Sequence, residues 1–416
     1  MNLKDLAAYL IALAALAACV LFLHGVDSGL SGSDESSHFL NGYLIWAYLT
    51  EAAGANPLAY ATDFYIHYPK ISIGHWPPLY YVFLSALFFA LPHAPAAFQC
   101  ANLAVSALPA WLVARETRRA AGFPWAVTAA VACVTIPICV EDSTYLMLDQ
   151  PLAAICFAAA LIWSAYSRKP SLRLGLAFGS AAAIAILVKG NGWALALLPP
   201  FHAALAGRWR VLFDWRSFAS AALVLVFVGA WTALTYRITS DGFQHAWGWA
   251  YFSQALPSFL GHTYANLGPV NALLALIGIG ASLRSEDDGT RELGRSCLAL
   301  ILATLIFHSI VPVALDMRYI SSALPPLAVF IALGLHALAR RFASPLTAGA
   351  AWKWAIAGLI VVSAPGALFL RERPARYNMH MDAAAETLLH EYPKLVAVVD
   401  GSPGAEGAFA SEVALR

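Results

Sequence analysis

The sequence predicts an all-α membrane protein that crosses the bilayer many times. Hydrophobic residues make up 60% of its 416 positions and charged residues only 12%, a balance that soluble globular chains seldom have. The hydrophobic residues also come in blocks of roughly 20, the number that an α-helix needs to span the hydrocarbon core. A formal net charge of +1 provides no overall field that would attract nucleic acid or an acidic substrate. We therefore expect a polytopic helical protein that binds membrane lipids and no nucleic acid.

About eleven blocks qualify as transmembrane helices. The first block is too long for the apolar core of a signal peptide and has no small-residue cleavage motif after it, so we expect it to be retained. The six cysteines lie in or beside these blocks without metal-type spacing, which favours small buried side chains over a disulfide framework. In chain order the expected spans cover residues 5–26, 98–114, 122–140, 150–166, 172–188, 191–206, 217–236, 267–283, 296–315, 320–339 and 354–370.

One further apolar segment, 77–92, decides the orientation of everything after it. If it does not span the membrane, the basic loops all fall on the same side as the N-terminus, as the positive-inside rule requires. If it spans, those loops face the opposite side. We therefore interpret 77–92, which is short and opens with two prolines, as an interfacial or re-entrant helix. The basic residues that this topology places on the cytoplasmic side are Arg115, Arg118, Arg119, Arg168, Lys169, Arg173, Arg208, Arg210, Arg216, Arg284, Arg291, Arg295, Arg340 and Arg341.

The chain divides into a transmembrane domain, residues 1–370, and an extracytoplasmic tail, residues 371–416. In the tail, the pattern predicts a helix over 381–391, a buried strand over 394–400 ("KLVAVVD") and a glycine-rich turn over 401–407 ("GSPGAEG"). Because one strand cannot form a sheet, this short α/β-like tail either opens a small α/β domain or packs on the external loops.

Polar side chains able to carry chemistry collect on the external side in this topology. Asp34 and Glu35 follow the first span, and His38 comes one helical turn later. One interpretation is a plain helix start, with Ser33 or Asp34 as N-cap and acidic residues favoured in the first turn. The other is functional, because carboxylates beside a membrane are costly to desolvate and usually have a partner or a purpose.

Other segments at the same level also allow two interpretations. Residues 68–82 have the prolines and aromatic residues of an interfacial belt. Asp149 stands at a helix mouth, either as an N-cap or as a functional group. Lys189 interrupts an apolar stretch, where its side chain either snorkels to the interface or binds a lipid phosphate. The aromatic segment 237–266 forms either a lid over the site or an amphipathic helix on the membrane surface.

Five short motifs in order resemble a known family. Their order and the topology of residues 1–370 are similar to those of the polyprenyl-phosphate-sugar-dependent glycosyltransferases of the GT-C membrane fold, which include protein O-mannosyltransferases and the lipid A aminoarabinose transferase. Each motif is weak alone, and together they are fairly specific. The motifs are Asp34-Glu35, Pro77-Pro78-Leu79-Tyr80-Tyr81, Asp149-Gln150-Pro151-Leu152, Val188-Lys189-Gly190, and Arg318-Tyr319 followed by "SSALPPLAVF".

The resemblance implies a GT-C-like enzyme that transfers a sugar from a polyprenyl-phosphate donor to an acceptor hydroxyl of a protein, lipid or glycan. Asp34 is then the general base of an inverting reaction at the external face, and Glu35 orients it or contacts the acceptor. Arg318, Lys189 and Tyr319 are implied to bind the donor phosphate, with Arg318 first because its forked guanidinium suits phosphate. The residues implied to support this site are Asp149, His75, Tyr80 and Tyr81.

The chain departs from the family pattern directly before the proline pair. Many relatives have a lysine there that resembles a donor-phosphate ligand, whereas this chain has Trp76, preceded by His75. In the aminoarabinose transferase, the position of His75 resembles a metal ligand. We therefore expect a divalent cation as the candidate cofactor, with His245 or His262 as further ligands.

Rival functions belong to other classes. A transporter or flippase of lipid-linked substrates is one alternative, but the ionisable residues gather at one face instead of the midplane and no internal repeat is visible. A ligase or phosphotransferase of the same fold and a catalytically silent scaffold are the others. The alanine-rich composition favours a bacterial inner membrane.

Overall fold

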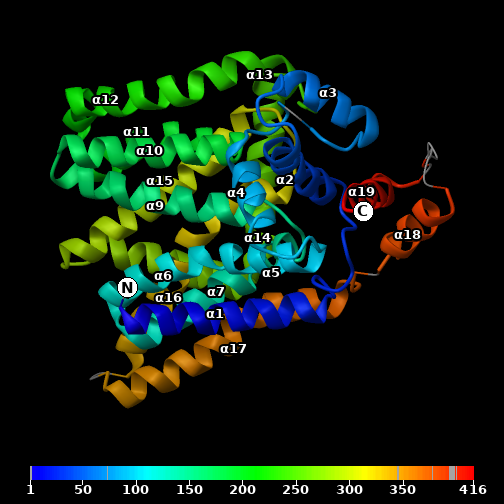
Figure 1. Cartoon of the computed structure of the whole chain (residues 1–416). Coiled ribbons are helices and arrows are strands. Elements are labelled where there is room, and N and C mark those ends of the chain that lie inside the picture. Colours follow the sequence, from blue (N-terminus) through cyan, green and yellow to red (C-terminus); the bar gives the residue numbers. More distant parts are fainter. Residues whose placement is uncertain (1, 73, 344–345, 377, 393–398, 400) are drawn as a thin grey trace.

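The protein is helical almost throughout. The computed structural model describes residues 2–72, 74–343, 346–376, 378–392, 399 and 401–416, and no β-strand occurs within these ranges. Figure 1 shows the long helices lying side by side in one bundle, and at one end α19 (Pro403–Ala414) lies beside α2 (Ser33–Glu51) while α18 (Met381–Glu391) lies beside α19. The all-α polytopic fold expected from the sequence is confirmed.

A helix is long and apolar enough to cross a membrane if it contains at least 18 consecutive residues that are predominantly apolar. Within the described residues, eight helices qualify, and a ninth span results if α7 and α8 count as one. The helices are α1 (Leu3–Phe22), α2 (Ser33–Glu51), α3 (Pro57–His67), α4 (Leu79–Phe88), α5 (Pro95–Ser106), α6 (Leu108–Ala121), α7 (Phe123–Thr135), α8 (Pro137–Ser143), α9 (Asp149–Arg168), α10 (Leu172–Val188), η1 (Gly190–Ala196), α11 (Leu198–Ala206), η2 (Trp209–Phe213), α12 (Trp215–Val224), η3 (Leu225–Gly229), α13 (Ala230–Asp241), α14 (Trp249–Leu283), α15 (Asp288–Ile310), η4 (Met317–Ala323), α16 (Leu324–Phe342), α17 (Ala348–Glu372), α18 (Met381–Glu391) and α19 (Pro403–Ala414).

Several expected spans are broken or short. The span expected at 122–140 bends by 63° between α7 and α8, because Ile136 precedes Pro137 and leaves the helical region at φ −59°, ψ 131°. The span expected at 172–188 corresponds to α10, which has 17 residues. The span expected at 191–206 is divided between the 3₁₀ helix η1 and the short α11.

The segment 77–92 forms the ten-residue helix α4. At 1.5 Å per residue it is about 15 Å long, which is half the hydrocarbon thickness. It packs against α2. The expectation that this segment is not a membrane-crossing helix therefore agrees with the structure.

Basic loops meet at one end of the bundle, as the topology requires. Lys4 and Arg340 line one cavity there, and Arg115, Arg119 and Arg168 line another. These residues are far apart in the chain, so their convergence supports the expected up-and-down path of the helices.

The tail packs on the first loop. The helix expected at 381–391 is α18, whereas residues 394–398 and 400 of the expected strand lie outside the described residues. The glycine-rich turn expected at 401–407 is wrong, because Ser402 caps a helix, α19, that starts at Pro403. Its glycines serve close packing: a β-carbon on Gly407 would lie 2.6 Å from the Ser36 side chain on α2.

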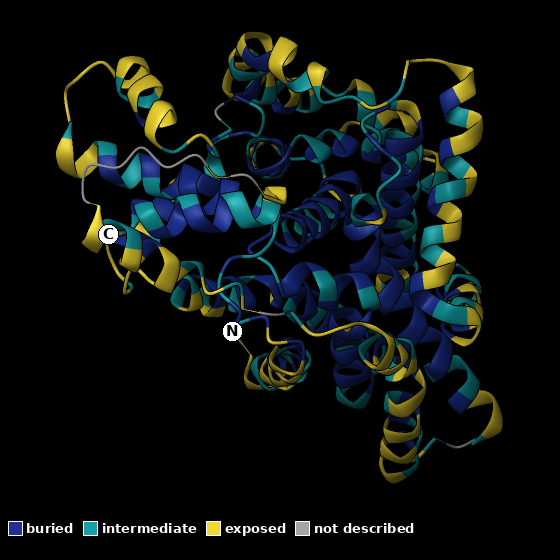
Figure 2. Cartoon of the chain, turned by 90° about the vertical axis from the view of Figure 1, so that its right-hand side faces the viewer, coloured by how far each residue is buried: buried dark blue, intermediate teal, exposed yellow. Residues whose placement is uncertain are grey.

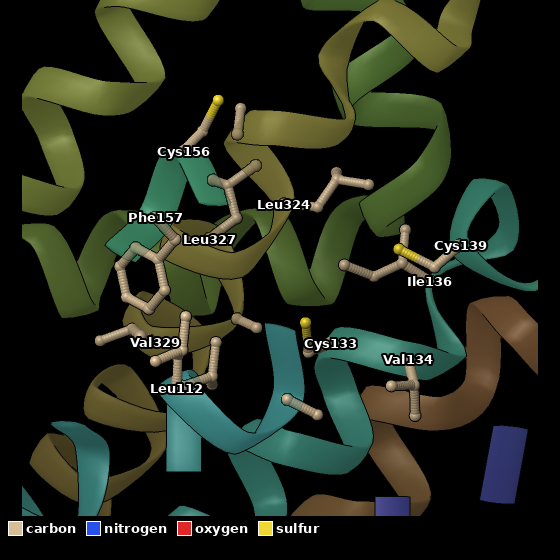
Figure 3. Close-up of a cluster of buried hydrophobic side chains, with 14 of the residues drawn as sticks. Leu112, Cys133, Val134, Ile136, Cys139, Cys156, Phe157, Leu324, Leu327 and Val329 are labelled. Atoms are coloured by element: carbon tan, nitrogen blue, oxygen red, sulfur yellow. The ribbon is translucent and has the colours of Figure 1, made fainter. Parts of the chain in front are cut away.

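The core lies where α6, α7, α9 and α16 meet. Figure 3 shows Leu112, Cys133, Phe157 and Val329 of these helices packed together. Figure 2 shows that burial is concentrated in the centre and that outer helices are exposed. In the apolar 18-residue stretch of Met317–Phe342, 83% of the residues are buried, whereas in that of α17 only 22% are. Helix α16 is therefore central and α17 peripheral.

The cysteines follow the expectation in part. Cys133, Cys139, Cys156 and Cys297 are buried, but Cys19 is half-buried and Cys100 is exposed on α5. The prediction of small buried side chains is therefore wrong for Cys100, because that face of α5 is turned away from the bundle.

Candidate active site

The first turn of α2 positions two carboxylates with different surroundings. The N-cap is Gly32, which has no side chain to cap with, instead of the expected Ser33 or Asp34. Glu35 at the third helical position accepts a hydrogen bond from the Gly32 amide at 3.1 Å, as the glutamate of a capping box does. The Glu35 side chain is fully buried, whereas that of Asp34 is 36% exposed. The helix-start interpretation therefore describes Glu35, and Asp34 is left available to a substrate.

Asp34 is paired with an arginine from the other half of the chain. Asp316 caps η4 by accepting from the Arg318 amide, and its carboxylate also accepts from Arg318 Nε at 3.0 Å. This contact aims Arg318 Nη1 at Asp34 Oδ2, at 2.8 Å. Burial alone would raise the pKa of Asp34, but the hydrogen bond and charge of Arg318 outweigh it and lower that pKa below its ordinary value. Asp34 is consequently a carboxylate at neutral pH.

A second, buried ion pair lies close by. Lys189 directly follows α10, and its Nζ donates to Oδ1 of Asp149, the first residue of α9, at 2.6 Å. Asp149 does not act as an N-cap, and Lys189 is buried, so neither the capping nor the snorkelling interpretation holds. Lys189 Nζ also lies 5.7 Å from the centroid of the Tyr319 ring, which supports a cation–π contact.

Two cavities meet at the Asp34–Arg318 pair. The first, which we call the lysine cavity, has a volume of about 360 Å³ and is lined by Lys189 and Tyr319. The second, the acidic cavity, has a volume of about 400 Å³ and is lined by Glu141 and other acidic groups. Within the part of the chain that the structure describes, Asp34 and Arg318 are the two residues common to both linings. A molecule in either cavity can therefore reach this pair.

The lysine cavity has an aromatic wall, and the acidic cavity has a charged one. The lysine-cavity wall includes His38, His75, Trp76, Trp193, Trp231, Tyr236, Phe243 and Phe307. The acidic-cavity wall includes Asp142, Tyr145, Met147, Asp316 and Met317. Of the aromatic segment expected to form either a lid or a surface helix, Phe243 lines the lysine cavity, while Trp249 is exposed.

Tyr80 and Tyr81, which follow the proline pair, contact residues next to the site without lining either cavity. Tyr81 Oη lies 3.0 Å from His38 Nδ1, and Tyr80 Oη donates to Asn102 at 3.0 Å. Burial lowers the pKa of the His38 imidazole to about 3, so His38 is neutral and lies edge-on to the Trp76 ring at 4.6 Å. Neither tyrosine lines either cavity, which fits the supporting role implied for them.

The three histidines proposed as metal ligands are engaged separately. His75 lines the lysine cavity, His245 lies against the Tyr251 ring at 5.2 Å, and His262 Nε2 is 3.1 Å from the Leu315 carbonyl oxygen. The described residues contain no cluster of three or more His, Cys, Asp or Glu side chains suited to a metal. Among the described residues these three histidines do not form one metal-type cluster, and the reaction proposed for this site is written without a metal ion.

Two residues that contact the site were missed by the sequence analysis. His308 stacks on Tyr319, with ring centroids 5.1 Å apart and an interplanar angle of 17°. An ionisable residue inside an apolar span was a usable signal for it. Arg376 of the tail binds Glu35, and nothing in its polar linker marked it out.

Comparison with solved structures defines the class of the fold. The chain superimposes on the transferase ArnT from Cupriavidus metallidurans, solved with bound undecaprenyl phosphate, with a TM-score of 0.55 and 16% identity, covering 96% of this chain and 76% of that one. It also superimposes on the archaeal oligosaccharyltransferase AglB from Archaeoglobus fulgidus, in complex with an inhibitory peptide and a dolichol-phosphate, with a TM-score of 0.52 and 13% identity, covering 92% of this chain and 58% of that one.

At these identities the likeness concerns the fold alone. Both structures are GT-C glycosyltransferases, so this chain has the GT-C-like fold that its motifs led us to expect. No protein-family model matches the sequence, and no curated protein matches it significantly.

Proposed function

We propose that the protein transfers a sugar from a polyprenyl-phosphate donor to an acceptor hydroxyl, with Asp34 as general base. The observation that carries this proposal is the position of Asp34 and Arg318 in the linings of both cavities. The fold it shares with two glycosyltransferases, which were solved with undecaprenyl phosphate and dolichol-phosphate, supports a lipid-phosphate donor.

The lysine cavity suits the donor. Its two cations, Lys189 and Arg318, can bind the phosphate, and its aromatic wall can cover the sugar or the first prenyl units. In this role, the buried Asp149 carboxylate holds the Lys189 ammonium in place before the lipid arrives. Such fixed charges stabilise a developing phosphate anion most strongly where water is scarce.

The acidic cavity suits the acceptor. The acceptor hydroxyl enters beside Asp34 Oδ and gives up its proton to that carboxylate. The acceptor oxygen then attacks the anomeric carbon from the face opposite the phosphate. The bond between the anomeric carbon and the phosphate oxygen breaks, and the configuration of the anomeric carbon inverts. The electron pair leaves with the lipid phosphate, whose charge Arg318 and Lys189 balance. Asp34 must be ionised for this step, as the effect of Arg318 on its pKa provides.

We further propose that the reaction takes place at the extracytoplasmic face of a bacterial inner membrane. The basic residues lining the two cavities at the other end of the bundle support this orientation through the positive-inside rule.

The test compares wild type with Asp34→Asn in membranes supplied with radiolabelled undecaprenyl-phosphate sugars. Loss of a general base lowers transfer by roughly a hundredfold or more. The matched control is Asp63→Asn, which changes an exposed aspartate on α3 and leaves transfer unchanged. Equal transfer by wild type and Asp34→Asn overturns the base assignment. If wild type transfers from no donor, the proposed function itself is wrong and the transporter and scaffold alternatives take its place.

A further inference from the structure

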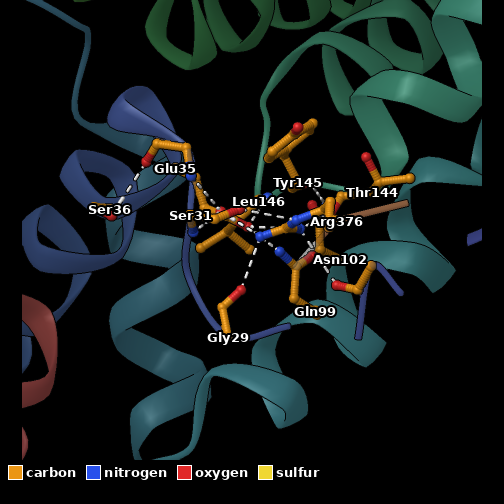
Figure 4. Close-up of polar contacts among 12 residues, drawn as sticks. Gly29, Ser31, Glu35, Ser36, Gln99, Asn102, Thr144, Tyr145, Leu146 and Arg376 are labelled. Atoms are coloured by element: carbon orange, nitrogen blue, oxygen red, sulfur yellow. Dashed lines mark hydrogen bonds and ion pairs between the residues drawn. The ribbon is translucent and has the colours of Figure 1, made fainter. Parts of the chain in front are cut away.

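The tail contributes a buried arginine to the base of α2. Arg376 lies between α17 and α18, and its side chain is 6% exposed against a fully buried Glu35. Its Nη2 donates to Glu35 Oε2 at 2.8 Å and its Nη1 approaches Oε1 at 3.4 Å. Figure 4 shows the guanidinium enclosed by residues from several segments. A charged pair buried in this way is costly to disrupt.

The remaining donors of Arg376 tie together two distant parts of the chain. The arginine donates to the Gly29 carbonyl oxygen at 2.8 Å and to Ser31 Oγ at 3.0 Å, both in the α1–α2 linker. It also donates to the Thr144 carbonyl oxygen after α8, and it lies over the Tyr145 ring at 4.4 Å. One side chain therefore fixes the start of α2 relative to the α8–α9 connection.

Both of these segments adjoin the proposed reaction site. Glu35 is the neighbour of Asp34 in the first turn of α2, and its carboxylate also accepts from the Leu146 amide at 3.1 Å and from Gln99. Tyr145 lines the acidic cavity together with Asp34. Movement of the Glu35 carboxylate would therefore displace Asp34 from Arg318 and change the cavity wall at the same time.

We propose that Arg376 is a positioning residue for Asp34, which makes the tail a working part of the transfer site. This inference rests on the proposed function. Arg376 acts through Glu35 and Tyr145 and lines neither cavity itself. Among the described residues, its side-chain hydrogen bonds go to neither Lys189 nor Asp149, so its removal leaves that buried ion pair in place.

The kinetic test uses the full chain with Arg376→Met, which replaces the aliphatic part of the side chain by an unbranched apolar one and removes the charge and the donors. Transfer from a radiolabelled undecaprenyl-phosphate sugar to membrane acceptors should lose at least about tenfold in kcat per folded molecule, because a misplacement of 1 Å can cost about a hundredfold. Binding of undecaprenyl phosphate, measured by native mass spectrometry, should not change. Arg376→Lys should restore part of kcat.

The control is Arg416→Met, which removes a tail arginine that pairs with Glu412 inside α19 and should leave kcat at the wild-type value. A purely structural role for Arg376 gives less folded protein with an unchanged kcat, and that result overturns the proposal.

Hydrogen exchange gives a readout that does not depend on any enzymatic activity. In Arg376→Met, exchange should rise in residues 31–36 and 144–147 and stay constant around Lys189. If wild type transfers no sugar, the proposed function fails while this measurement still decides the positioning role. Unchanged exchange in both segments refutes that role.

Discussion

Replacing Lys189 by methionine leaves Asp149 as a buried carboxylate without its cation. The pair is 2.6 Å apart, and the two side chains are 10% and 1% exposed. At an effective dielectric constant of about 20, charges at this distance attract by about 6 kcal/mol. Desolvation offsets part of this attraction, and breaking a buried pair costs about 3–5 kcal/mol in practice. We expect Lys189→Met to lose stability on this scale, because Lys189 is bonded to Asp149 Oδ1 and Asp149 Oδ2 has no hydrogen-bond partner among the described residues.

The double variant Lys189→Met/Asp149→Asn separates stability from binding. Neutralising both partners removes the unpaired buried charge. The free energy of unfolding of the double variant, measured in mixed micelles, should therefore recover most of what Lys189→Met alone loses. Binding of undecaprenyl phosphate should stay weak, because the proposed phosphate ligand is still missing. The control Lys70→Met breaks a more exposed pair with Glu406 and should cost at most about 1 kcal/mol.

Two results would refute this reasoning. If Lys189→Met costs no more than Lys70→Met, the Lys189–Asp149 pair does not stabilise the fold as its burial indicates. If the double variant binds undecaprenyl phosphate as tightly as wild type, Lys189 is not a phosphate ligand and the donor site has to rest on Arg318 alone.

Two further predictions concern protonation and helix packing. In wild type, the acid limb of the pH profile of kcat/KM reports the pKa of Asp34, and it should lie below the ordinary aspartate pKa of 3.8 because Arg318 lowers it. Arg318→Gln removes the charge of Arg318 but keeps Asp34 buried, so the limb should move to higher pH. A limb that does not move argues against Asp34 as the base. A β-carbon on Gly278 would overlap the backbone of α16, so Gly278→Ala should lower the free energy of unfolding by several kcal/mol. The control Gly280→Ala places its β-carbon in open space and should cost almost nothing. Equal costs would contradict the close approach of α14 and α16.

Hydropathy alone predicted most of the bundle, because crossing a membrane imposes one dominant constraint on helix length and composition. It did not predict breaks that depend on backbone geometry. The bend before Pro137 had a local signal, since a residue that precedes proline avoids the helical region. The glycines of 401–407 misled because glycine at a turn and glycine at a close helix contact look alike in sequence, and Ser402 and Pro403 decided in favour of a helix.

The site was accessible to sequence reasoning only in fragments. Asp34 and Arg318 are 284 positions apart, and no local pattern states that they pair; the order of the family-like motifs supplied that link. Glu35 was grouped with Asp34 because the two are adjacent, yet successive residues on a helix point in different directions. Arg376 could not be found at all, because its partners come from segments that only the folded chain brings together.

The two cavities share Asp34 and Arg318 and otherwise have separate walls among the described residues. Substitutions around Tyr145 and Met147 therefore change one chamber without altering the residues that line the other. In evolutionary terms this separation lets a lineage exchange one substrate while the machinery for its partner substrate stays constant. Divergence in this protein's relatives should accordingly be uneven, concentrated on one side of the ion pair and sparse on the other.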